Sequence, residues 1–211
     1  GNPSAHNYAG TIAREALDAA RASIAGSLGG VSVDELTFTS GATEANNTAI
    51  HGAVACYRGG GCGGREGACG KKQTKQKKAP EVPHLVATTI EHASVYEPLQ
   101  ALRANGRAQT TLVPVDQEGR VRLPALRAAL AHPHTILLVV IGGNNETGII
   151  QNIGAIVAAA REHAVPVLLD ATQLVGKYPV LPRLLGVDML SCSAHKFHGP
   201  RGIGLLWAAA E

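Results

Sequence analysis

Lys196 lies in the stretch Ala194-His-Lys-Phe-His198, and its surroundings in the sequence suggest chemistry. It follows a short apolar run at 188–191 that we expect to be a buried strand, and it precedes Gly199-Pro200, which requires a turn. An amine held at a strand end among partly buried neighbours loses its proton more readily, and it can then form a Schiff base with a carbonyl group. A single lysine is nevertheless most often a solvated loop residue. The interpretation therefore depends on the rest of the chain.

A glycine turn at 40–44 is a candidate phosphate site. It joins a β-prone run at 35–39 to a helical pattern, and the first N–H groups of such a helix are unpaired and can bind an anion. Ala42 and Thr43 would supply these donors. An ordinary helix cap with Glu44 in the first turn explains the same residues without a ligand, so both interpretations stay open.

Strand-like and helical patterns alternate along most of the chain. We expect helices at 5–28, 123–131 and 153–163, a helix that begins at the glycine turn 41–43 and continues to 57, and a short helix around 99–102. We expect strands at 35–39, 84–89, 110–113, 135–141, 165–169, 188–191 and 203–207. This alternation predicts an α/β fold with a mainly parallel sheet and helices on both faces. Ligands bind to such sheets beyond the carboxyl ends of the strands.

Composition limits the class of protein. The chain has 211 residues, 45% hydrophobic and 17% charged, which is typical of one large globular domain. No apolar run is long enough to span a membrane and no signal peptide opens the chain, so we expect an intracellular protein, cytoplasmic or in an organelle. The four cysteines do not form a disulfide framework. We expect free thiols and, from the spacing of Cys56, Cys62 and Cys69, no zinc site.

The basic charge of the chain belongs to one segment. Residues 58–78 hold seven Lys or Arg and one Glu, whereas the whole chain has a net charge of +3. The segment 59–80 is rich in glycine and lysine and has almost no apolar residues, which predicts a disordered insertion. Acidic partners such as nucleic acid could be attracted to it by charge. We favour a solvated linker and expect neither nucleic acid nor a membrane as a partner.

The side chains expected at the ends of the strands include an amine, a carboxylate and possible phosphate donors, and together these groups can bind pyridoxal phosphate. An amine forms the Schiff base, and an aspartate keeps the pyridine nitrogen protonated so that the ring can accept electrons. Lys196 and Asp170 fit these two roles. The spacing of Cys192, His195 and His198 also suggests a metal, but the Gly-Pro turn argues against a closed ligand shell, and we expect no metal.

The chain resembles the class V aminotransferase group of fold-type-I pyridoxal phosphate enzymes, specifically the cysteine desulfurases and selenocysteine lyases. The resemblance rests on motifs that occur in the family's order over almost the whole chain: Asn2-Pro-Ser4 with His6, Thr39-Ser-Gly-Ala-Thr-Glu44, Glu91-His92, Asn144-Asn-Glu146 with Gly148, Asp170-Ala-Thr-Gln173 with Gly176-Lys177, and Ser193-Ala-His-Lys196 with His198-Gly-Pro200.

The resemblance assigns a role to each matching residue. Lys196 would carry the cofactor, while His92 would stack on its ring and move protons. Asp170 would bind the pyridine nitrogen, Gln173 the ring hydroxyl oxygen, and Asn145 both cofactor and substrate. The phosphate would be surrounded by Ala42, Thr43, Ser193 and His195.

The resemblance also implies an activity and a domain organisation. Residues 1–211 would be the cofactor-binding large domain, incomplete at both ends, without the smaller C-terminal domain that carries the family's sulfur-accepting cysteine loop. The complete protein would release sulfur or selenium from cysteine or selenocysteine, giving alanine, for uses such as iron–sulfur cluster assembly. It would be a homodimer with a sulfur-acceptor protein as partner. The alternatives are another class V reaction such as transamination, or a truncated non-catalytic binding protein.

Overall fold

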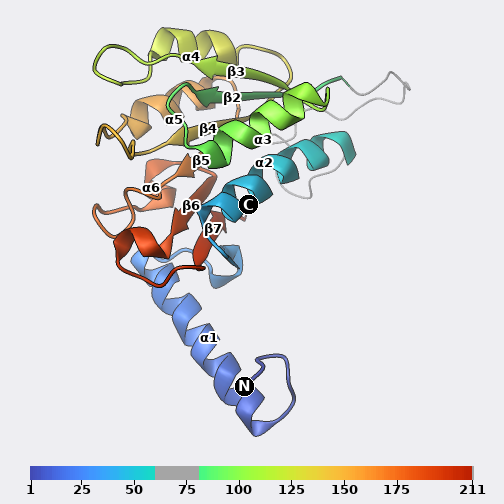
Figure 1. The fold of residues 1–211 in the computed structure, drawn as a ribbon, viewed down its shortest axis with the longest axis vertical. Helices are drawn as coiled ribbons and strands as arrows, with labels where there is room; N and C mark the ends of the chain where they lie inside the picture. The colour runs from blue at the N-terminus through green and yellow to red at the C-terminus, as the bar shows by residue number, and fades with distance from the viewer. Residues whose placement is uncertain (60–80, 211) are drawn as a thin grey trace.

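The computed structural model describes residues 1–59 and 81–210, and its centre is a seven-stranded sheet (Figure 1). The predicted disordered insertion lies outside these residues except for Gly59. The strands are β1 (Leu36–Thr39), β2 (His84–Thr88), β3 (Gln109–Val113), β4 (Thr135–Ile141), β5 (Val167–Asp170), β6 (Met189–Ser193) and β7 (Gly204–Ala208), in the spatial order β1-β7-β6-β5-β4-β2-β3. Strand β7 runs antiparallel to both of its neighbours, β1 and β6, while the other pairs are parallel. The predicted mainly parallel sheet is confirmed.

Helices cover both faces of this sheet, as predicted. They are α1 (Tyr8–Ser27), α2 (Ala42–Gly59), α3 (Ala93–Ala104), α4 (Leu123–Leu130), α5 (Ile153–Glu162) and α6 (Pro182–Leu185), with short 3₁₀ helices at Val33–Glu35 and Ala194–Phe197. Apolar residues of α2 and α3 pack on one face, while those of α4, α5 and the end of α1 pack on the other. Two separate hydrophobic cores therefore hold the sheet between them.

The central strands are apolar because both of their sides are buried. All five residues of β2 are buried, as are the last five residues of β4, and Leu137 and Leu138 at the middle of β4 belong to opposite cores. Parallel sheets covered on both faces have such continuous apolar strands. This arrangement fixes the strands rigidly, so that the loops at their carboxyl ends are held at one edge.

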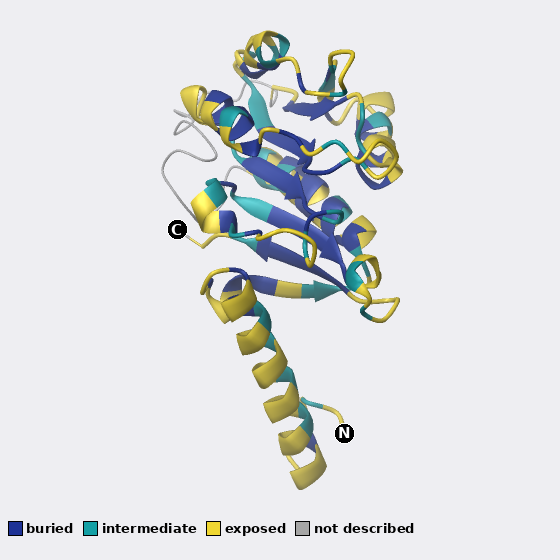
Figure 2. Cartoon of the chain, turned by 90° about the vertical axis from the view of Figure 1, so that its left-hand side faces the viewer, coloured by how far each residue is buried: buried dark blue, intermediate teal, exposed yellow. Residues whose placement is uncertain are grey.

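Helix α1 extends away from the sheet, and most of its surface is exposed (Figures 1 and 2). Its predicted apolar positions are only partly covered: Ile12 is 49% exposed, whereas Ala25 and the following Leu28 join the core. Asn7 caps the helix by accepting from the Gly10 N–H at 2.8 Å. The predicted helix is therefore confirmed, but only its last turns contact the body of the fold.

Several element boundaries differ from the prediction. Helix α2 begins at Ala42, directly after the glycine turn, as predicted. Helix α3 is longer than the predicted short helix around 99–102 and runs from Ala93 to Ala104, because the His92 side chain caps its first turn. Strand β5 begins at Val167 and not at 165, since Pro166 has no N–H to donate to a neighbouring strand.

The cysteines differ in state. Cys192 is a free, buried thiol in β6, as its place in an apolar strand predicts. Cys56 is disulfide-bonded, so the expectation of a free thiol is wrong at this position. The intervals between the cysteines argue against a zinc site, but they do not bear on whether two thiols pair. Cys62 and Cys69 lie outside the described residues.

Of the helices in residues 1–59 and 81–210, none combines the length and apolar character that a membrane crossing requires.

Candidate functional site

The predicted site residues gather at the carboxyl edge of the sheet. Asp170 and Ser193 are the last residues of β5 and β6, and Lys196 lies in the 3₁₀ helix that follows β6. The turns after β1, β2 and β4 carry further predicted residues, which are Ala42 with Thr43, His92, and Asn145. The sequence prediction that these groups follow strand ends is therefore confirmed.

The start of α2 packs directly against the end of β6. The Ala42 N–H donates to Ser193 Oγ at 2.7 Å, so the two residues expected to share the phosphate are in contact. A Cβ on Gly204 would lie 2.4 Å from the Gly41 Cα, and only glycine allows the two backbones to approach this closely. The Glu44 carboxylate also accepts from the Ser40 N–H at 2.6 Å. The turn thus has a helix cap of its own, while Thr43 stays exposed.

Asp170 is buried, with 3% of its surface exposed. Its Oδ1 accepts from the Thr172 N–H at 3.0 Å, and its Oδ2 accepts from Asn46 Nδ2 at 2.9 Å. These two donors hold the carboxylate at the end of β5. A fixed carboxylate in a site with little water can hold a proton on a nearby base.

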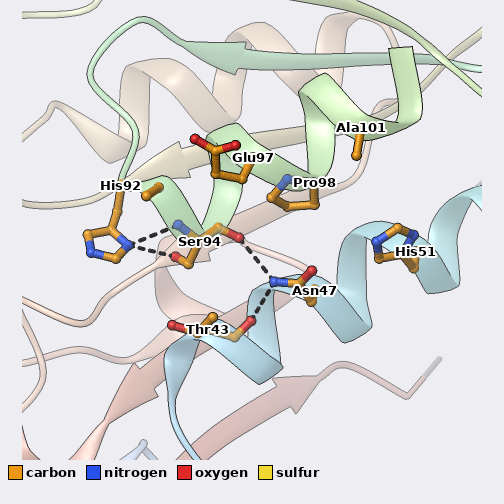
Figure 3. Close-up of a pocket in the computed structure, with 9 residues that line it drawn as sticks. Thr43, Asn47, His51, His92, Ser94, Glu97, Pro98 and Ala101 are labelled. Atoms are coloured by element: carbon orange, nitrogen blue, oxygen red, sulfur yellow. Dashed lines mark hydrogen bonds between the residues drawn. The ribbon is translucent and has the colours of Figure 1, made fainter. Parts of the chain in front are cut away.

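His92 caps the N-terminus of α3. Its Nδ1 atom accepts from the Ser94 N–H at 3.0 Å and lies 2.9 Å from Ser94 Oγ. The ring is therefore fixed on one side by the helix and exposed on the other (Figure 3).

Lys196 and His195 are both exposed. The expectation of partly buried neighbours holds for Ala194, which is buried, and for Phe197, which packs against the core, but Lys196 itself is exposed. His198 ends this helix with a φ of 67°, and Gly199 then donates its N–H to the Ala194 carbonyl at 2.9 Å. The amine is consequently placed on a well-defined turn and is accessible.

Asn145 and Gln173 have different surroundings. Asn145 is exposed, whereas its neighbour Asn144 organises the turn by accepting from the N–H groups of Glu146 and Thr147 at 3.0 and 2.9 Å. The Gln173 Oε1 accepts from Lys177 Nζ at 2.7 Å. Asn144 thus presents Asn145 at the edge.

A cleft of about 590 Å³ opens between α2 and α3 and includes two of the predicted residues (Figure 3). Asn47 joins the helices across it, because its Nδ2 donates to the Thr43 carbonyl at 2.8 Å and to the Ser94 carbonyl at 3.3 Å. The residues that line the cleft are Thr43, Asn47, His51, His92, Ala93, Ser94, Glu97, Pro98 and Ala101. The phosphate turn and His92 therefore face the same open space.

The Glu91 carboxyl group lies between the ends of β2 and β4. Its Oε1 accepts from Thr88 Oγ1 at 2.6 Å and from the Ile141 N–H at 3.0 Å, while its Oε2 is buried without a hydrogen-bond partner. Burial, together with the negative charge of Asp170, raises the pKa of Glu91 to about 8 despite these hydrogen bonds. Glu91 therefore carries a proton at neutral pH.

The Cys192 thiol is unsuited to nucleophilic chemistry. Burial, with a smaller effect from the Asp170 charge, raises its pKa to about 12. The thiolate is the reactive form of cysteine, and it is essentially absent from this side chain at neutral pH. Within the described residues, there is also no group of three or more His, Cys, Asp or Glu side chains arranged to hold a metal ion.

Sequence reasoning missed three residues that hold the site together: Asn46, Glu91 as a proton carrier, and Ser94. Asn46 is fully buried and donates to both Asp170 and Ser94. A polar residue in the first turns of a helix ordinarily indicates a solvated face. The sequence feature that could have identified Asn46 as a site residue is its position one helical turn after the glycine turn, on the side of α2 that contacts the sheet edge.

Comparisons with known proteins add family information. The model described as "Aminotransferase class-V" matches residues 72–211, which is more than half of the chain. Among the relatives, a cysteine desulfurase IscS of Mannheimia succiniciproducens is 41% identical over 208 residues and one of Dictyoglomus turgidum is 39% identical over 207. Each alignment covers 98% of this chain and 46% of the relative. The chain thus spans about half the length of these relatives.

Solved structures of similar proteins agree with the family match. A protein titled "NIFS-like protein" superposes with a TM-score of 0.84 at 31% identity, covering 99% of this chain and 51% of that one. A structure of SspA in complex with cysteine gives 0.81 at 32% identity and covers 99% and 53%. The α/β fold with its mainly parallel sheet is that of these structures.

Proposed function

Because the chain belongs to the class-V aminotransferase family, we propose that it binds pyridoxal phosphate and that the complete protein is a cysteine desulfurase or selenocysteine lyase. Residues 1–211 would form the cofactor-binding large domain of that enzyme. The observation that carries the proposal is Asp170, a buried carboxylate held by two donors at the sheet edge that also bears the Lys196 turn.

The residues at this edge fit the cofactor. Thr172 Oγ1 is a buried hydroxyl without a hydrogen-bond partner, two residues after Asp170, and a polar ligand would satisfy it. The start of α2 offers N–H groups to a phosphate, with Thr43 exposed beside them. Lys196 supplies an accessible amine. An anion site, a fixed carboxylate and an amine are the groups that pyridoxal phosphate requires.

Each side chain then has a definite task. Lys196 would hold the cofactor aldehyde, and Asp170 would keep a proton on the pyridine nitrogen. Ala42, Thr43, Ser193 and His195 would bind the phosphate, with Gln173 and Asn145 at the ring hydroxyl and the substrate. His92 would lie against the ring and move a proton. When bound, the cofactor accepts electrons from the substrate carbon, which weakens the carbon–sulfur bond.

The relatives support the choice of substrate. Two of them are named cysteine desulfurases and one solved neighbour is in complex with cysteine. In the proposed reaction, the substrate's sulfur passes to a thiol, forming a persulfide, and the carbon that loses sulfur gains a proton to give alanine. Cys192 is excluded as that thiol by its burial and raised pKa. We propose a homodimer and a sulfur-acceptor protein as its partners.

Product analysis of the complete protein tests this proposal. With cysteine and a reducing thiol, we expect alanine and sulfide in equal amounts, or alanine and selenide from selenocysteine. Transamination would instead produce a keto acid with no sulfide and leave the amino group on the cofactor. Formation of a keto acid without sulfide would refute the desulfurase proposal while leaving cofactor binding intact.

A further inference from the structure

Two hydrogen bonds to His92 define which of its ring nitrogens carries the proton. The Ser94 N–H lies 3.0 Å from His92 Nδ1, and a backbone N–H can only donate. The Nδ1 atom must therefore present its lone pair. In a neutral imidazole the proton then resides on Nε2.

The Ser94 hydroxyl must donate to the same nitrogen. Its Oγ is 2.9 Å from Nδ1, and since Nδ1 has a lone pair there, the single hydroxyl proton points at it. The Ser94 oxygen consequently needs a donor of its own. Asn46 Nδ2 supplies it at 3.0 Å.

The Asn46 amide has its orientation fixed by both of its ends. Its Nδ2 also donates to Asp170 Oδ2 at 2.9 Å, and its Oδ1 accepts from Ser191 Oγ at 2.6 Å. A rotated amide would turn an acceptor towards the Asp170 carboxylate. Asn46 is fully buried, so that no water compensates for such a mismatch. The hydrogen bonds that link Asp170, Asn46, Ser94 and His92 therefore allow only one placement of their protons.

We propose that Asn46 and Ser94 are positioning residues that hold His92 as its Nε2–H tautomer and couple its orientation to Asp170. Asn46 gives one amide proton to Asp170 and the other to Ser94, and Ser94 gives its own proton to His92. The inference rests on the proposed function insofar as His92 and Asp170 contact the cofactor. It leaves Nε2 of the exposed His92 ring as the nitrogen that handles protons (Figure 3).

Nitrogen-15 NMR of histidine side chains in the full chain without cofactor tests the inference directly, because it reports the protonation of each ring nitrogen. In the wild type at neutral pH, we expect His92 to be protonated on Nε2 and to have a bare, hydrogen-bonded Nδ1. The exposed His51 on α2 serves as an internal reference.

Two variants perturb the network in different ways. Ser94→Ala removes the hydroxyl but keeps the backbone donor, and we expect the preference for the Nε2–H tautomer to fall roughly fivefold, the effect of one neutral hydrogen bond. Asn46→Asp replaces the amide donor to Ser94 by a carboxylate acceptor, so the Ser94 proton should turn towards the new carboxylate and away from His92. Ser94→Thr retains a hydroxyl and should preserve the wild-type spectrum.

The outcomes separate this inference from the proposed function. A proton on Nδ1 in the wild type would overturn the inference, as would an unchanged His92 spectrum in Ser94→Ala. If Asn46→Asp does not fold, Ser94→Ala still decides. Since the spectra are recorded without cofactor, a failure to bind pyridoxal phosphate would refute the proposed function and not the tautomer.

Discussion

Glu91→Gln should make the protein more stable at neutral and alkaline pH. The pKa of Glu91 is raised from 4.5 to about 8, so the folded protein keeps a proton that the unfolded chain releases. The stabilisation from this proton is fully present below pH 4.5 and is lost as the pH rises to 8. At about 1.4 kcal/mol per pH unit, the loss is about 3 kcal/mol at pH 7 and about 5 kcal/mol above pH 8.

Glutamine is the neutral analogue of the protonated acid, and it retains an oxygen for the Thr88 hydroxyl and the Ile141 N–H. The assay is urea unfolding of the full chain between pH 5 and 9. The difference in the free energy of unfolding between Glu91→Gln and wild type should grow with pH and level off above 8. Glu15→Gln, at an exposed position on α1, is the control. A difference that is independent of pH, or that favours the wild type more as pH rises, would refute the assignment of a proton to Glu91.

Three further predictions concern single side chains. His84 is buried between the hydroxyls of Thr111 and Thr135, and burial, with a smaller effect from His132, lowers its pKa to about 4. The folded protein therefore keeps His84 neutral, and the free energy of unfolding is highest above pH 6.5 and should fall by about 3 kcal/mol as the pH drops to 4. Urea unfolding of the wild type against His84→Gln measures this fall. Asp170→Asn should reduce turnover of the complete protein roughly 100-fold or more while phosphate-dependent cofactor binding persists, and a variant with wild-type turnover would exclude Asp170 as the ring partner. Cys192→Ala should leave sulfide production unchanged, because its thiol is protonated at neutral pH; loss of sulfide in a folded, cofactor-loaded variant would contradict this.

The sequence predicts the sheet well where apolar strands have clear limits. The predicted bounds of β4 agree with the structure, because a run of seven β-prone residues, Thr135–Ile141, ends at a glycine pair. The antiparallel direction of β7 is not predicted, since a strand's sequence does not state which way it pairs. The short helix α6 is missing from the prediction because four residues carry too little periodicity.

The sequence predicts the site as a set of residues but not as a network. Spacing and strand ends locate Asp170, His92 and Lys196 at one edge. Whether Asn46 faces solvent or Asp170 depends on the packing of α2 against the sheet, which a local pattern does not specify. Glu35 shows the same limit: the pattern predicts the start of a strand there, whereas the structure has a buried carboxylate that accepts from Trp207 Nε1 at 3.0 Å.

The most direct test of the central claim is borohydride reduction of the cofactor-loaded chain followed by peptide mapping. Reduction should link the cofactor covalently to Lys196, and Lys196→Ala should abolish the label while Lys177→Ala retains it. Lys177 is the relevant alternative, because its Nζ lies 2.7 Å from the Oε1 atom of Gln173 at the same edge. A label on Lys177, or a label that survives Lys196→Ala, would contradict the assignment of Lys196 as the cofactor-bearing residue.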